Sequence, residues 1–174
     1  MKRAPAPLHT ADGARAAPYA AKLRTPFAVL GIRTANGKLT GVDYLPRSER
    51  AQRPVDAFTA EVVAEIGRYL ADPQHRFALP LDPAGTPFQR RVWQEIDRIP
   101  VGESRTYGEI ARALRTGPRA VGNACGANPI ALVTPCHRVV GSRGALGGFG
   151  GASAGDPLRI KRWLLVHEGY RFGA

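Results

Sequence analysis

The residues best suited to covalent chemistry lie in the segment 128–140, where Cys136 stands directly before His137. The thiolate form of cysteine is the nucleophile, and a neighbouring imidazole can increase its population by taking the thiol proton. Pro135 lacks an N–H and fixes its own φ, so the apolar run 130–133 cannot simply continue as a central strand. We therefore expect Cys136 to lie on a constrained turn beside a base. The alternative is a small buried residue, because free cysteines are usually buried.

Length and composition limit the classes of protein that this chain can be. Its 174 residues suit one domain or two small ones with a sizeable core. The apolar runs are too short for a transmembrane helix, and the basic N-terminal segment lacks the apolar stretch of a secretory signal. We therefore expect a cytoplasmic protein that makes no contact with a membrane.

The charge of the chain is strongly basic and uneven. The formal net charge is +11, and residues 86–174 contribute +7 of it, with 13 Lys and Arg against 6 Asp and Glu. Residues 1–85 contribute +4, with 12 against 8. A basic surplus of this size favours a polyanionic partner, with nucleic acid as the first candidate. A basic surface that only aids solubility is the alternative.

The spacing of cysteines and glycines argues against metal and nucleotide cofactors. Cys125 and Cys136 are the only cysteines, they form no CxxC pair, and no Cys/His spacing is typical of zinc. The Gly-rich segment 141–155 lacks the GxxxxGK pattern of an ATP-binding loop. We expect it to form a pocket wall or a lid, with no metal and no cofactor, and we expect both thiols to be free.

The elements that must position these residues begin with a small α+β unit. Residues 1–17 are predicted to form a disordered tail. Strands are predicted over 28–33 and 39–45, because Asn36-Gly37 between them is a strong hairpin signal. Helical spacing follows over 55–70 and ends at Asp72-Pro73. We place this scaffold domain at residues 18–82.

The second domain, residues 83–174, is predicted to be mostly helical. Thr86-Pro87 begins a helix that ends before Pro100, and a last helix covers 158–167. Between them, helices over 106–114 and from 118 to 125 flank a Gly-Pro turn. This pattern fits a DNA-binding helix-turn-helix, although a simple hairpin of two helices looks the same.

Several ordered segments resemble the O6-alkylguanine-DNA alkyltransferases, also called methylated-DNA–protein-cysteine methyltransferases. They are residues 85–89 with Val92-Trp93, 99–103, 106–111, 119–122, Asn128-Pro129, the acceptor motif 135–139, and 163–169. The resemblance is close over about residues 83–170, weaker over 18–82, and absent before that. A series of motifs in the family's order is far more specific than a single Cys-His pair.

The resemblance implies both a fold and a reaction. The expected fold is α+β, with a small antiparallel sheet and helix of ribonuclease H type followed by a helical domain that contains a helix-turn-helix. The expected function is DNA repair, in which the alkyl group of O6-alkylguanine, and of O4-alkylthymine as a second candidate, passes irreversibly to Cys136. The base would first be flipped out of double-stranded DNA. Each molecule would act once, as a monomer without a cofactor.

The same resemblance assigns roles to the predicted catalytic residues. His137 takes the proton of Cys136 through a water molecule, and Glu168 stabilises the imidazolium, as in a catalytic triad. A direct Cys136–His137 contact is not expected, because neighbours in an extended strand point to opposite faces. Asn128 ties the helix-turn-helix to the acceptor turn, and Tyr107 donates a hydrogen bond to the flipped guanine.

The resemblance also implies five DNA contacts. Four of them, Arg119, Ala120, Gly122 and Asn123, lie on the small-residue helix that begins at Pro118, and Tyr107 lies on the helix before it. Arg119 would fill the gap left by the base, and the small residues would let the helix enter the minor groove. The base pocket is expected to consist of Cys136, Val139, Phe149 and Gly150.

The chain also departs from the family's usual pattern. Ala131 stands where proline is common, Thr134 replaces an aliphatic residue, Phe149 replaces tyrosine, and segment 150–157 is longer. Cys125 is no acceptor in the family, and we interpret it as a packing residue. Three other functions remain open at this point: a protein that recognises alkylated DNA without transfer, a transcriptional regulator, and a cysteine hydrolase.

Overall fold

The computed structural model describes residues 18–151 and 155–172. The predicted tail at 1–17 lies outside the described residues, as do three positions of the long Gly-rich segment. No helix within the described ranges has the length and the apolar character needed to cross a membrane.

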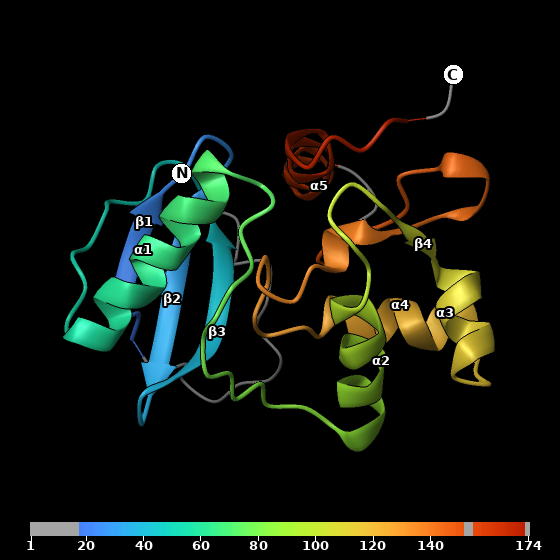
Figure 1. Cartoon of the computed structure of the whole chain (residues 1–174), viewed down its shortest axis with the longest axis horizontal. Coiled ribbons are helices and arrows are strands. Elements are labelled where there is room, and N and C mark those ends of the chain that lie inside the picture. Colours follow the sequence, from blue (N-terminus) through green and yellow to red (C-terminus); the bar gives the residue numbers. More distant parts are fainter. Residues whose placement is uncertain (1–17, 152–154, 173–174) are drawn as a thin grey trace, which may run out of the picture.

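The N-terminal part is a three-stranded antiparallel sheet with one helix beside it (Figure 1). Its elements are β1 (Ala21–Arg24), β2 (Val29–Ala35), β3 (Lys38–Leu45) and α1 (Ala57–Ala71). Asn36 and Gly37 both have positive φ, 50° and 68°, which is the geometry of the hairpin turn that the sequence predicts. Asp56 caps α1 by accepting a hydrogen bond from the Thr59 amide at 2.7 Å, so the helix begins after this residue.

The C-terminal part begins with three helices whose ends the sequence predicts to within about a turn. They are α2 (Pro87–Asp97), α3 (Tyr107–Ala113) and α4 (Pro118–Gly126). Thr86 and Thr106 each form a capping box with the residue three positions later, which fixes where α2 and α3 begin. Residues 114–117 join α3 to α4 and include Arg115 with φ of 52°.

The rest of the C-terminal part contains short elements and one longer helix. They are β4 (Arg105–Thr106), the 3-10 turns η1 (Cys136–Arg138) and η2 (Ser142–Gly144), β5 (Val139–Val140) and α5 (Asp156–His167). β4 and β5 pair in parallel and hold the acceptor turn against the start of α3. The sequence does not reveal this pairing, because two-residue strands are too short to show a pattern.

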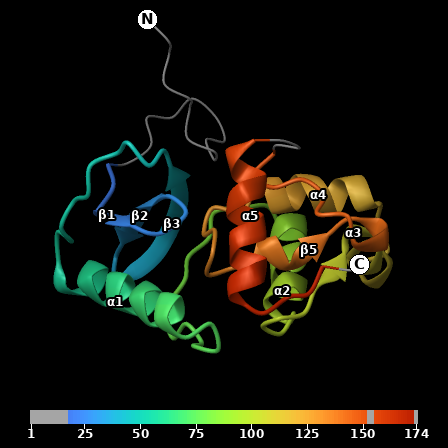
Figure 2. The ribbon, with the colours of Figure 1, turned by 90° about the horizontal axis from the view of Figure 1, so that it is seen from above.

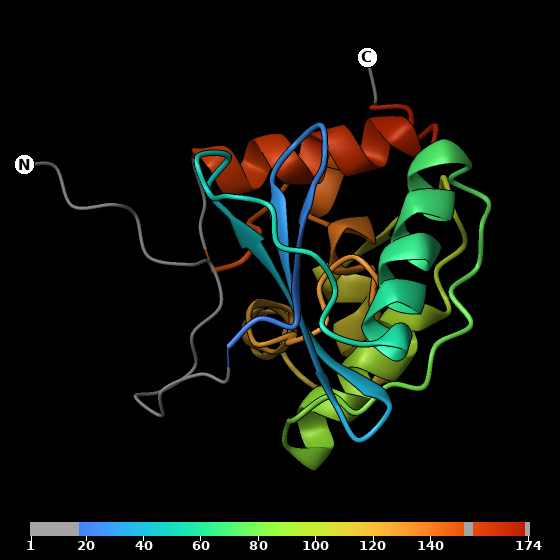
Figure 3. The same cartoon turned by 90° about the vertical axis from the view of Figure 1, so that its left-hand side faces the viewer.

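The two parts share one continuous core, and α5 lies between them (Figure 2). Viewed from the side of the sheet, α5 runs across one end of the strands while α1 lies beside them (Figure 3). Phe27 packs against Trp163 of α5 with ring centroids 4.6 Å apart. The Val42 amide of β3 donates to the Pro129 carbonyl at 2.9 Å, so the sheet is joined directly to the segment that leads to Cys136. The α+β fold class is therefore confirmed.

Candidate active site

Cys136 lies on a buried turn that Asn128 holds in place. The Asn128 amide nitrogen is 3.1 Å from the Cys136 sulfur and 3.0 Å from the Thr134 carbonyl oxygen. Its side-chain oxygen accepts a hydrogen bond from the Ile130 amide at 3.0 Å. One side chain thus joins the end of α4 to the acceptor turn by two hydrogen bonds, and a third fixes the chain that leads to the turn. The predicted constrained turn is confirmed, since residues 136–138 form a 3-10 turn.

Glu168 is the centre of a buried network of hydrogen bonds. It lies within 2.8 Å of His137 Nε2 and accepts a bond of the same length from the Tyr69 hydroxyl. Arg138 donates from Nε and Nη2 to its two oxygens at 2.8 and 2.9 Å. The Arg138 guanidinium is itself held by the Ile99 carbonyl at 2.6 Å. The carboxylate therefore has a fixed orientation and a compensated charge.

His137 does not contact Cys136 directly, although the reason differs from the predicted one. The two residues share a 3-10 turn rather than an extended strand. His137 Nε2 faces Glu168, and Nδ1 has no hydrogen-bond partner among the described residues despite being buried. Nδ1 is thus the ring nitrogen that is available for exchange of a proton with a water molecule or a ligand.

The charges around the site fix the protonation states at rest. Burial opposes the charged form of Glu168, but His137 and Arg138 outweigh it and hold the pKa of the carboxyl far below its usual range. Burial also lowers the pKa of His137, against the opposing effect of Glu168, so the imidazole is neutral at pH 7.

The pKa of the Cys136 thiol is raised well above its ordinary value, so the thiol is protonated at rest. The neighbouring Cys125 is the main cause of this shift, and burial is the second. The Asn128 amide acts in the opposite direction, because it stabilises the thiolate. Proton removal must therefore accompany the reaction.

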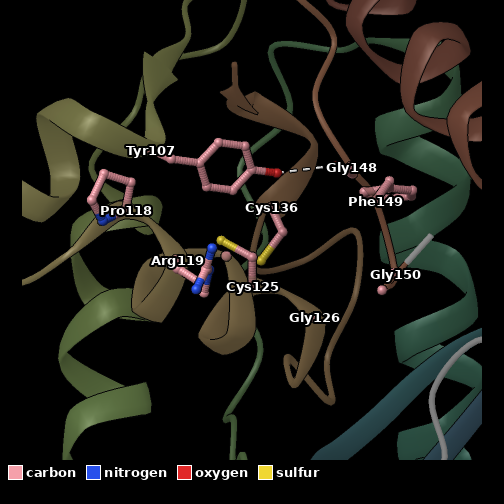
Figure 4. A pocket seen from close by; sticks show the side chains of 11 residues that line it. Tyr107, Pro118, Arg119, Cys125, Gly126, Cys136, Gly148, Phe149 and Gly150 are labelled. Carbon is pink, nitrogen blue, oxygen red and sulfur yellow. Dashed lines mark hydrogen bonds between the residues drawn. The ribbon is translucent and has the colours of Figure 1, made fainter. Parts of the chain in front are cut away.

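Cys136 lines a cavity of about 480 Å³ between α3, α4 and the Gly-rich loop (Figure 4). The Tyr107 hydroxyl borders this space and donates to the Gly148 carbonyl at 3.0 Å. Arg119 also lines the cavity although its side chain is exposed, so the cavity reaches the surface at the start of α4. The remaining lining comes from Pro118, Gly122, Cys125, Gly126, Phe149, Gly150 and Gly151.

Comparison with known proteins gives the family. A sequence model described as the DNA-binding domain of 6-O-methylguanine DNA methyltransferase matches residues 87–170. The constitutive methylated-DNA–protein-cysteine methyltransferase of Bacillus subtilis is 37% identical over 160 residues, which cover 86% of this chain and 94% of that protein. The chain belongs to the methylated-DNA–protein-cysteine methyltransferase family. The enzyme of that name from Mycolicibacterium paratuberculosis is 50% identical over 111 residues, 63% of this chain and 64% of that protein.

Solved structures of the family agree with this assignment. The crystal structure of Mycobacterium tuberculosis OGT in complex with DNA has a TM-score of 0.71 at 37% identity and covers 84% of this chain and 90% of that one. The structure of an O6-methylguanine DNA methyltransferase from Methanococcus jannaschii has a TM-score of 0.62 at 28% identity, over 88% and 95% of the two chains.

In this member of the methyltransferase family, four of the five predicted DNA contacts lie on α4, and the fifth, Tyr107, begins α3. Arg119 and Asn123, one turn apart on α4, are exposed, while Ala120 and Gly122 are half-buried. Of the predicted pocket residues, Phe149 and Gly150 line the cavity together with Cys136. Val139 does not lie in the lining; it is fully buried, and its carbonyl accepts a hydrogen bond from Lys161.

Three charged or polar residues of the site were not predicted from the sequence. The Lys161 ammonium is fully buried and donates to the carbonyls of Val139 at 2.6 Å and Gly148 at 2.9 Å, and burial lowers its pKa to about 8. It thereby ties α5 to the pocket wall. Tyr69 and Arg138 support Glu168 as described above. Arg138 stands inside the acceptor motif and could have been found there, whereas nothing in the pattern signals Tyr69 or Lys161.

Cys125 lies on α4 and belongs to the buried hydrophobic core, which agrees with its interpretation as a packing residue. It also lines the cavity together with Cys136.

Proposed function

We propose that this protein repairs DNA by transferring the alkyl group of O6-alkylguanine to Cys136. The observation that carries the proposal is the position of the acceptor sulfur. It lies in a cavity that opens beside Arg119 on α4, and Asn128 and the His137–Glu168 pair stand around it. The cavity falls within the range of small-molecule sites, which suits a single flipped base.

The first step in the proposed reaction removes the thiol proton. It passes through a water molecule to Nδ1 of His137, the ring nitrogen that Glu168 leaves free. The carboxylate then stabilises the imidazolium, as the third member of a triad does. Because Glu168 keeps its charge far below neutral pH, it can play this role throughout the physiological range.

The second step moves the alkyl group. The Cys136 thiolate attacks the alkyl carbon, a sulfur–carbon bond forms, and the bond from carbon to O6 breaks with its electron pair left on guanine. Tyr107 can turn its hydroxyl from Gly148 towards a ring nitrogen and stabilise this charge. The proton taken from sulfur finally neutralises the base. A thioether offers no leaving route, so each molecule reacts once.

DNA binding would use α3 and α4 as a helix-turn-helix. We infer that α4 faces the minor groove, with Arg119 in the place of the flipped base and Ala120, Gly122 and Asn123 against the backbone. The net charge of +11 supports a polyanionic partner. Four further points stay predictions: a ribonuclease H-like N-terminal domain at 18–82, a separate domain at 83–174, a monomeric state and a cytoplasmic location.

The test is the mass of the intact protein after incubation with a duplex that contains O6-methylguanine. We expect a gain equal to one methylene group, confined to Cys136 by peptide mapping and saturating at one per molecule. The Cys136→Ser variant should bind the same duplex without the gain. Tight binding by the unaltered protein with no gain in mass would contradict transfer and would point to a recognition protein.

A further inference from the structure

The pocket contains a second thiol in addition to the acceptor. Cys125 comes from the last turn of α4 and Cys136 from η1, and both are buried free cysteines. Figure 4 shows the two sulfur atoms next to each other inside the cavity that both residues line. The chain has two cysteines in 174 residues, and both of them meet at this one place.

The surroundings of Cys125 do not call for a sulfur atom. The residue belongs to the buried core and also lines the cavity, where its neighbours on α4 are Gly122 and Gly126. What distinguishes cysteine from other small residues at this position is that an oxidant can join it to a second cysteine.

We propose that Cys125 and Cys136 form a reversible disulfide when the protein meets a peroxide. One thiol loses its proton, the thiolate attacks a peroxide oxygen, and the O–O bond breaks; the leaving hydroxide takes up that proton, so that a sulfenic acid and water result. The second thiol attacks the sulfenic sulfur, the S–O bond breaks, and hydroxide leaves and takes up the thiol proton to give another water. In sum, two thiols and one hydrogen peroxide give one disulfide and two waters, and the peroxide receives the two electrons.

The disulfide would hold the acceptor sulfur in an oxidised state that can be reduced back to the thiol. A sulfenic acid without a nearby thiol proceeds to sulfinic and sulfonic acids, which reductants do not restore. Because Cys125 lies beside Cys136 in the same cavity, the second step is intramolecular and competes well with further oxidation. The disulfide blocks alkyl acceptance until a dithiol reduces it. This consequence rests on the proposed function of Cys136, whereas formation of the bond does not.

The test compares the reduced protein with Cys125→Ser and Cys125→Ala. Each is treated with a small excess of hydrogen peroxide without reductant, unfolded, treated with iodoacetamide and weighed. We expect the unaltered protein to lose two hydrogen atoms, to stay monomeric and to bind no iodoacetamide, and peptide mapping should join residues 125 and 136. Dithiothreitol should restore its methyl acceptance completely. Both variants should instead gain oxygen on Cys136 and recover only a small part of their own initial acceptance.

Two results would overturn the proposal. One is oxygen gained on Cys136 of the unaltered protein with no internal disulfide, and the other is recovery of acceptance that is the same with and without Cys125. If one variant fails to fold, the other variant still tests the proposal. The number of iodoacetamide groups bound by the unaltered protein tests it as well. Methyl acceptance by the fully reduced protein is measured separately, so a failure of the transfer function is seen independently of the disulfide.

Discussion

The Glu168 carboxylate has three polar side-chain partners, His137, Arg138 and Tyr69, and this makes the folded protein sensitive to acid. Its pKa is held far below that of an unfolded glutamic acid, so the unfolded chain binds the extra proton first as the pH falls. The pKa of His137 is also lowered by burial, which means that the unfolded state again binds a proton more readily. Both groups therefore stabilise the folded protein at neutral pH, and this stabilisation is lost on acidification.

We predict two pH windows of instability. The free energy of unfolding should begin to fall below about pH 6.5, where an unfolded histidine protonates, and fall more steeply below about pH 4.3, where an unfolded glutamate does. Urea titrations at a series of pH values measure it. His137→Asn should flatten the first window and Glu168→Gln the second. A pH dependence that both variants leave unchanged would contradict this assignment.

Asn128 is predicted to act on both stability and reactivity. Replacement by alanine leaves the Ile130 amide and the Thr134 carbonyl without this partner, at a cost of about 1–3 kcal/mol. It also removes the hydrogen bond that lowers the pKa of Cys136, so alkylation at pH 7 should be slower. Denaturant titration and the rate of reaction with free O6-methylguanine test the two effects.

A matched control exists for this change. Asn123→Ala, on the exposed face of the same helix, should alter neither stability nor the reaction with free base. If both variants behave alike, Asn128 does not tie the turn to α4.

At the residue scale, the motif around Cys136 predicted most of the site. Cys136, His137, Asn128 and Glu168 are brought together, because they stand in segments that resemble one family. The protonation state of the thiol could not be predicted, since it depends on burial and on Cys125.

At the scale of single elements, α4 is built from small residues for a reason that the folded protein alone does not explain. A Cβ added at Gly122 would meet only the Tyr107 ring, at an ordinary contact distance of 3.9 Å. Glycine within a helix costs about 0.5–1 kcal/mol relative to alanine. The fold therefore tolerates an alanine here, and the proposed approach of DNA to α4 supplies a reason for glycine that the folded chain does not.

Gly122→Ala is accordingly predicted to raise the stability of the protein and to lower its rate of repair. Unfolding should require about 0.5–1 kcal/mol more, because alanine favours the helix. Repair of duplex DNA should become slower, since the added methyl group points into the base cavity. Denaturant titration and single-turnover kinetics measure the two effects. A variant that is more stable and repairs duplex at the same rate would show that α4 needs no slim surface.

Arg119→Ala is predicted to distinguish the duplex from the free base. If its side chain replaces the flipped base, the loss should slow repair of duplex DNA by about tenfold or more, the equivalent of about 1.4 kcal/mol. Reaction with free O6-methylguanine should change little.

Arg76→Ala is the matched control for Arg119, because it removes the same charge from an exposed position on the N-terminal part. Its effect should be limited to a weaker dependence on salt. Equal losses with duplex and free base for Arg119→Ala would refute the assigned role.

The limits of prediction at this scale follow from element length. The starts of α2 and α3 could be predicted from Thr86 and Thr106, because caps are local signals. The parallel pair β4 and β5 could not, since its two short strands are defined only by tertiary contact.

For the whole molecule, the N-terminal sheet and helix contribute directly to the active site. The Tyr69 hydroxyl of α1 donates to Glu168, and β3 bonds to Pro129 ahead of the acceptor turn. Sequence patterns predicted a scaffold packed against the second half, but not which residues meet. Contacts between distant segments leave no periodic signal in either segment.

Tyr69→Phe is predicted to reduce both stability and repair. The lost hydrogen bond to a buried carboxylate should cost about 1.5–3 kcal/mol, and transfer should slow because Glu168 is less well oriented. Tyr19→Phe is the matched control, since its hydroxyl donates to Asp43 at the same distance of 2.8 Å within the N-terminal part. That variant should lose stability while keeping the transfer rate of the folded protein. Equal transfer rates in the two variants would contradict a role for Tyr69 in the site.

The bond between Tyr69 and Glu168 joins residues 99 positions apart, and this has a consequence during synthesis. The ribosome adds Tyr69 and Cys136 before Glu168, so a nascent chain carries the thiol before it carries the carboxylate that supports its base. Contacts of such long separation form late, after the local helices and the hairpin. The hydrogen bond that supports Glu168 from the N-terminal part can therefore form only after α1 and α5 have come together.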